Sequence, residues 1–179
     1  AYNGDKSYPI VLRHDLVMQI PSLKKKYLKY ENFRDQTIDD IFSKQELDNA
    51  VKLQANELRS GVLMNNGSKF NFHPLPAEAQ VSCMYAIHAS DIDGDGVEDL
   101  VMGGNLYRVK PEAGRYDASY GAVLKGDGKG GFIAQAATQT GLLLDGEIRE
   151  IKPITINGQR VLLVARNNDS LLFVNQRGR

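Results

Sequence analysis

Carboxylate side chains fill alternate positions of one short stretch of the chain, and their spacing suits metal binding. The stretch runs from Asp91 to Asp99 and reads Asp-Ile-Asp-Gly-Asp-Gly-Val-Glu-Asp. Carboxylates this close repel one another unless a hard cation lies among them, and Ca²⁺ takes about six to eight oxygen ligands. We predict a calcium site with Asp91, Asp93, Asp95 and Asp99 as side-chain ligands and Val97 as a backbone carbonyl ligand.

The residues after the acidic loop decide which elements position it. An EF-hand loop begins in the same way, but it has a bidentate Glu at its twelfth position and a helix on each side. Here the twelfth residue is Met102, within the short apolar run 100–102 that precedes Gly103. Such a run favours a strand, so we expect the loop to join two strands. The alternative is an Asp/Gly-rich turn that binds no metal.

Two glycine-rich segments extend the pattern into a resemblance to a known family. Residues 91–103 resemble the calcium loop of FG-GAP/VCBS repeats, the blades of integrin-α-like β-propellers. Residues 126–132, Gly-Asp-Gly-Lys-Gly-Gly-Phe, resemble the hairpin that closes such a blade, and residues 65–70 are a weaker copy. The resemblance covers roughly residues 58–175. It implies a structural Ca²⁺ and a chain that is the C-terminal piece of a larger, bacterial-type propeller protein.

An internal repeat allows blades to be drawn. The same 62 residues separate Phe70 from Phe132, and in that register residues 100–102 align with residues 162–164. The fold class we predict is mainly β, a partial propeller of about two to two and a half four-stranded antiparallel blades. The expected strands are residues 85–90, 99–104, 121–125 and 131–135 in one blade and 147–154, 160–165 and 170–175 in the next.

The N-terminal part has a different pattern, with apolar residues from Leu16 to Tyr30 at helical intervals of three and four. Thr37 and Ser43 have the sequence context of helix N-caps, and the second is expected to begin a helix that includes Leu47, Val51 and either Leu53 or Ala55. The predicted division is residues 1–12 as the end of a blade strand, 13–57 as a small helical insertion, and 58–179 as propeller blades. Within the last, residues 58–84 form an outer hairpin and linker, 85–135 the complete calcium-loop blade, and 136–179 the final incomplete blade.

Composition excludes several classes of partner. The chain has 22 basic and 22 acidic residues, which argues against nucleic acid and anionic membrane surfaces. No apolar run reaches the roughly 18 residues of a membrane span. The single cysteine, Cys83, excludes an internal disulfide and a cysteine-based zinc cluster. The chain opens without Met or a signal peptide, so we expect a processed or trimmed product.

A candidate ligand face lies opposite the calcium loop, because successive loops of an up-and-down blade fall on opposite faces. The loops expected there are rich in aromatic and basic side chains, which interfaces favour. The residues predicted for this face are His73, Lys110, Arg115, Tyr116 and Tyr120. The alternative is a long loop ordered by its own salt bridges and aromatic packing.

The function these features predict is a calcium-stabilised binding or adhesion scaffold that is not an enzyme. Such a site would be filled outside the cell and largely empty in the cytosol, so we expect an extracytoplasmic location: periplasm, cell surface or secreted. The resemblance implies a protein or glycan ligand, and open sheet edges are expected to permit self-association.

Two other functions stay open. Some polysaccharide lyases resemble this repeat, which makes a carbohydrate-active enzyme on a calcium propeller the main alternative. It would take its base and charge stabiliser from His73, Lys110, Arg115 and Tyr116. Against it, the histidines lack metal spacing, and no nucleophile elbow or phosphate loop occurs. A structural spacer between other domains is the third function.

Overall fold

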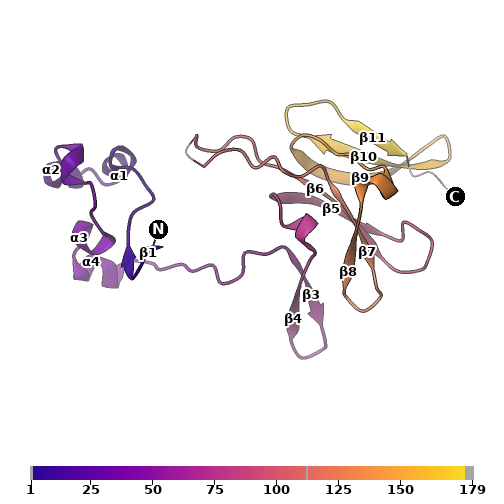
Figure 1. The fold of residues 1–179 in the computed structure, drawn as a ribbon, viewed down its shortest axis with the longest axis horizontal. Helices are drawn as coiled ribbons and strands as arrows, with labels where there is room; N and C mark the ends of the chain where they lie inside the picture. The colour runs from indigo at the N-terminus through magenta and orange to yellow at the C-terminus, as the bar shows by residue number, and fades with distance from the viewer. Residues whose placement is uncertain (1, 112, 176–179) are drawn as a thin grey trace. The chain divides into compact units, whose positions relative to one another are not determined.

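The computed structural model describes residues 2–111 and 113–175, and expectations for Ala1, Glu112 and residues 176–179 lie outside these ranges. The fold is mainly β, with 34% strand and 18% helix. The chain divides into two compact units, Ala1–Asn56 and Glu57–Arg179 (Figure 1). Among the described residues no helix has the length and apolar character needed to cross a membrane.

The first unit is built from short helices around a small apolar core. Thr37 and Ser43 are N-caps as predicted, because each side-chain oxygen accepts a backbone N–H three residues later, from Asp40 at 3.2 Å and from Glu46 at 3.3 Å. Each of these two acidic side chains also accepts a hydrogen bond from the backbone N–H of its capping residue, so each pair forms a complete capping box. The helices are α1 (Arg13–Gln19), α2 (Leu23–Lys26), η1 (Tyr30–Asn32), α3 (Ile38–Ile41) and α4 (Lys44–Asn49). The buried core residues are Leu16, Leu23, Tyr27 and Ile41.

Two parts of this unit differ from the sequence prediction. The helix after Ser43 ends at Asn49, and Val51 lies 87% exposed in an extended segment, because the small core offers it no apolar partner. Residues 1–12 were expected to end a blade strand. Instead β1 (Tyr2–Asn3) pairs with β2 (Lys6–Ser7) in a local antiparallel hairpin, because Gly4 adopts a φ of 64° that permits the tight turn between them.

The segment between the units gives the first testable prediction. Residues 51–60 contain no helix or strand, and the side chains of Lys52 and Arg59 are exposed. We expect limited trypsin digestion to cut first after Lys52 or Arg59, because proteases act on exposed extended backbone before hydrogen-bonded sheets. Mass spectrometry of a digestion time course would identify the cuts. First cleavage after Lys125 or Lys152, within strands, would contradict the division.

The second unit contains three antiparallel sheets of consecutive strands, none of which closes on itself within the described residues. The strands predicted from residue 85 to residue 175 are confirmed, with ends that differ by no more than two residues. The four-stranded sheet is β5 (Met84–Ser90), β6 (Asp99–Gly104), β7 (Ala122–Gly126) and β8 (Phe132–Gln135). The three-stranded sheet is β9 (Ile148–Ile156), β10 (Gln159–Arg166) and β11 (Leu172–Asn175). The remaining elements are β3 (Gly61–Asn65), β4 (Phe70–Pro74), η2 (Ala77–Ala79) and α5 (Ala137–Thr140).

Strand β6 lies at the centre of the packing, because apolar side chains cover both of its faces. Side chains alternate between the faces of a strand, so Leu100 and Met102 pack in one core and Val101 packs in another. The first core includes η2 and the β3–β4 hairpin, and the second includes β9 and β10. All six residues of β6 are buried. The acidic loop therefore leads directly into the most enclosed strand of the unit (Figure 1).

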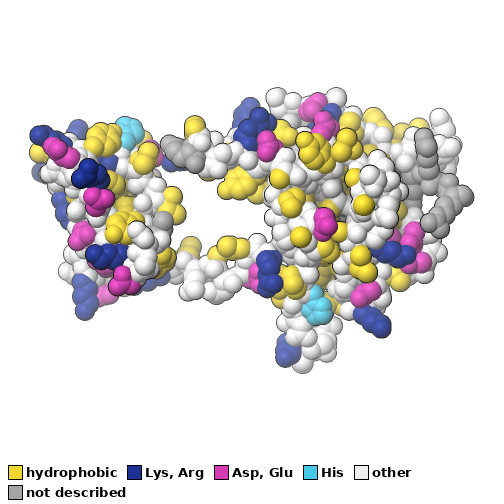
Figure 2. Space-filling model, in the orientation of Figure 1, with side chains coloured by type: hydrophobic (Ala, Val, Ile, Leu, Met, Phe, Trp, Pro, Cys, Tyr) yellow, Lys and Arg dark blue, Asp and Glu magenta, His cyan; other side chains and the backbone are white. Residues whose placement is uncertain are grey.

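The internal repeat is visible in the sheets. β10 pairs with β9 and β11 as β6 pairs with β5 and β7, so the aligned runs are equivalent strands. The turn before each contains a glycine with positive φ, Gly96 at 83° and Gly158 at 79°. On the face drawn in Figure 2, basic and acidic side chains are interspersed, as the balanced composition leads one to expect.

Candidate metal centre

Asp99 anchors the acidic loop to the sheet. It is the first residue of β6 and its side chain is only 3% exposed. One carboxylate oxygen accepts the Ile92 N–H at 3.1 Å, and the other accepts the Gly126 N–H at 2.9 Å. The first bond holds the start of the loop and the second holds the end of β7. A single buried carboxylate thus joins three segments of the unit.

Asp91 folds the loop around its own carboxylate. Its Oδ1 accepts the N–H of Gly94 at 2.7 Å and of Asp95 at 3.1 Å, and its Oδ2 accepts the Gly96 N–H at 3.0 Å. Gly94 and Gly96 have φ values of 82° and 83°, a conformation that other residues adopt only with strain. The alternation of Asp and Gly therefore has a local structural cause as well as a chemical one.

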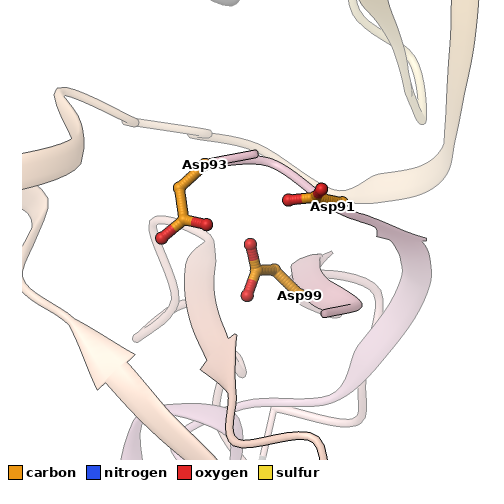
Figure 3. Close-up of side chains that lie close together, drawn as sticks. All are labelled: Asp91, Asp93 and Asp99. Atoms are coloured by element: carbon orange, nitrogen blue, oxygen red, sulfur yellow. The ribbon is translucent and has the colours of Figure 1, made fainter. Parts of the chain in front are cut away.

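Three of the predicted ligands converge. Asp91, Asp93 and Asp99 each offer an oxygen, and these atoms lie within 4.8 Å of one another (Figure 3). Three carboxylate oxygens this close form a hard donor set that could hold a metal ion. Asp99 is buried and the other two carboxylates are exposed, so an ion could enter from solvent.

The other two predicted ligands lie differently. Asp95 is outside the converging group: one of its oxygens accepts the Val97 N–H at 2.9 Å and the other lies 3.0 Å from the Lys125 ammonium. The Val97 N–H bond and then Lys125 lower the pKa of the Asp95 carboxyl. Val97 as a carbonyl ligand stays a prediction.

Lys125 is a residue of this site that sequence reasoning missed. Its ammonium contacts the carboxylates of both Asp93 and Asp95, which raise the pKa of the lysine, Asp93 most strongly. Lys125 belongs to β7, and only the pairing of β6 with β7 brings it to the loop. The sole sequence signal is its place directly before the glycine-rich hairpin at Gly126. It supplies a built-in positive charge that partly offsets the carboxylates.

The predicted ligand face is brought together only in part. His73 is exposed on β4, in a separate hairpin. Lys110, Arg115, Tyr116 and Tyr120 lie in the long connection between β6 and β7. That connection is ordered partly by its own contacts, since the Arg115 guanidinium stacks 4.0 Å from the centroid of the Tyr107 ring, and Leu106 and Tyr116 exchange two backbone hydrogen bonds.

Tyr120 is the member of the predicted face that lines a hollow, of about 410 Å³. Sequence reasoning missed the carboxylates there, because they come from three separate connections. The lining residues are Asn105, Tyr107, Asp117, Ser119, Tyr120, Asp145, Gly146 and Asp169. Asp145 and Asp169 both pair with the Arg166 guanidinium, at 2.9 and 3.0 Å.

A buried polar network, which the sequence analysis did not predict, supports this hollow. The Asn105 amide donates to the carbonyls of Ser119 at 2.8 Å and Gly146 at 3.0 Å. The buried Glu147 carboxylate accepts the Tyr107 N–H and the Asn167 amide, both at 2.8 Å, and these bonds lower its pKa. The two asparagines are 62 residues apart, so the repeat provided a signal for this pair.

Comparisons of the chain with protein-family models, with curated proteins and with solved structures found no match. The family resemblance therefore rests on the acidic loop, the glycine-rich hairpins and the repeat. The fold itself is a mainly β unit of small antiparallel sheets beside a unit of short helices.

Proposed function

We propose that this chain is a calcium-stabilised binding scaffold of the FG-GAP/VCBS propeller type that acts outside the cytoplasm as a recognition or adhesion module. The convergence of Asp91, Asp93 and Asp99 at the start of β6 carries the proposal. An ion there would neutralise carboxylates that otherwise repel, and through Asp99 it would act on the loop and on the end of β7 together. Its role would be structural, because it would hold the loop residues Asp91 and Asp93 to Asp99, the first residue of the strand that both cores cover.

The ligand we propose is a protein or glycan, bound on the face opposite the acidic loop. Support comes from the connection between β6 and β7, where Arg115, Tyr116 and Tyr120 are exposed. Tyrosine and arginine contribute strongly to interfaces. The hollow beside Tyr120 adds the carboxylates of Asp117, Asp145 and Asp169, which can accept hydrogen bonds from sugar hydroxyls.

Thermal melts in EDTA and in added Ca²⁺ test the metal. A ligand at 100 times its Kd stabilises the folded state by about 2.7 kcal/mol, so we expect Tm to rise by several degrees. Asp93→Ala should remove most of this rise, because it deletes a converging ligand. Lys125→Met is the contrasting variant: it removes a cation that competes for Asp93 and should enlarge the response.

If Ca²⁺ leaves the Tm of the unsubstituted protein unchanged from its value in EDTA, the acidic loop is an Asp/Gly turn. A response that Asp93→Ala leaves intact would place the ion elsewhere. A parallel titration with Mg²⁺ checks the selectivity, and we expect the smaller effect for that ion because it retains its waters and requires stricter octahedral geometry.

A further inference from the structure

A second cavity, of about 750 Å³, lies between the four-stranded and three-stranded sheets. Its volume is within the range of about 300–1,000 Å³ that small-molecule sites occupy. Apolar side chains line it from both sheets, among them Val101 of β6, Leu162 of β10 and Val174 of β11. Hydroxyl groups line it as well, from Ser90, Thr138 and Thr140. The cavity is thus amphipathic and is formed by one compact unit.

The charge on the described side chains that line this cavity is positive. Arg160, near the start of β10, is the one Lys, Arg, Asp or Glu among the described residues that line it. In the described part of the chain Arg149 pairs with Glu147 and Arg166 pairs with Asp145 and Asp169. The guanidinium of Arg160, by contrast, has no hydrogen bond or ion pair within residues 2–111 and 113–175. A guanidinium that has no neighbouring carboxylate can donate two parallel N–H bonds to the carboxylate of a ligand.

His88 gives an independent observation that points to a ligand. Its side chain is 8% exposed and lines the same cavity, and its Nε2 has no hydrogen-bond partner among the described residues. Buried polar atoms are almost always hydrogen-bonded, so an orphan nitrogen in a cavity wall indicates a missing partner. Burial lowers the pKa of the His88 ring, and the nearby cations Arg160 and Lys152 lower it further. A negative group in the cavity would pair with the Arg160 guanidinium and could accept a hydrogen bond from the Nε2–H of His88.

We propose that this cavity binds a small organic carboxylate with an apolar body. The carboxylate would pair with Arg160 and come within reach of His88, and the body would pack against Val101, Leu162 and Val174. A cationic ligand is disfavoured because no Asp or Glu is among the described residues that line the cavity. A polyphosphate is disfavoured because one arginine and an apolar lining do not balance several charges. The inference is independent of calcium, since none of the converging aspartates lines this cavity.

The test is isothermal titration of the whole chain with hexanoate and octanoate, in EDTA so that metal cannot contribute. We expect saturable binding at one site, with affinity rising about fourfold for each methylene. The matched neutral probe 1-hexanol and the oppositely charged hexylammonium should each bind at least about tenfold more weakly than hexanoate.

Two variants locate the site. Arg160→Gln should weaken hexanoate binding about tenfold or more, and Arg34→Gln, an exposed arginine of the helical unit, should leave it unchanged. His88→Leu should also weaken binding of the carboxylate but not of the alcohol. Thermal melts of each variant confirm that it is folded. Absence of binding at millimolar hexanoate, equal binding of hexanol, or full binding by Arg160→Gln would overturn the proposal.

Discussion

Asp99→Ala is expected to lower the free energy of unfolding of residues 57–179 by about 2–4 kcal/mol even in EDTA. The substitution removes the acceptor for the Ile92 and Gly126 N–H groups, and the Gly126 bond is buried. A buried donor without a partner bears its full desolvation penalty. Urea unfolding in EDTA, followed by far-UV circular dichroism, would measure the loss.

Asp95→Ala is the matched control for this prediction. It removes a carboxylate from the same loop, but this one is exposed, and it pairs with Lys125 and a loop N–H. Exposed ion pairs contribute little to stability, so the midpoint should move far less than in Asp99→Ala. Equal shifts in the two variants would show that the buried bonds of Asp99 do not hold the loop to β7.

Gly104→Ala is expected to cost about 3 kcal/mol or more and to leave much of the sheet unit unfolded. A Cβ at Gly104 would lie 1.7 Å from the carbonyl oxygen of Cys83 and 2.7 Å from its carbonyl carbon. Both atoms are backbone and cannot rotate away. The same Cys83 oxygen accepts the Asn105 N–H at 2.9 Å, so moving it would also break a bond next to β6.

Gly67→Ala separates this clash from the general effect of losing a glycine. Nothing lies within 4 Å of a Cβ built at Gly67, and only its φ of 88° opposes alanine, a strain of about 1–2 kcal/mol. Thermal melts of the two variants would compare them directly. A Tm for Gly104→Ala equal to or above that of Gly67→Ala would mean that β5 and β6 can move apart without a loss of stability, which contradicts the prediction.

Local patterns were enough to predict the elements that hold the candidate site. The strands around the acidic loop follow from short apolar runs between glycines. The N-cap at Thr37 and the capping box at Ser43 follow from a hydroxyl residue with acids in the first turn. These signals work because hydrogen bonds across a few residues depend on near neighbours only. The prediction that the helix after Ser43 includes Val51 was wrong for the opposite reason. The length of that helix depended on an apolar core that the small unit does not provide.

The sequence by itself determined the acidic loop, its entry into a strand, and the glycines that let it fold. Only the tertiary structure decided which carboxylates converge. Asp99 is buried because β6 lies between two cores, and Asp95 lies outside the group, where it accepts the Val97 N–H and contacts Lys125 of β7. Contacts between strands join residues far apart in the chain, and their partners depend on how whole sheets pack. For the same reason the sequence did not reveal Arg160 and the buried His88 as a pair, since they line one cavity only after the two sheets pack together.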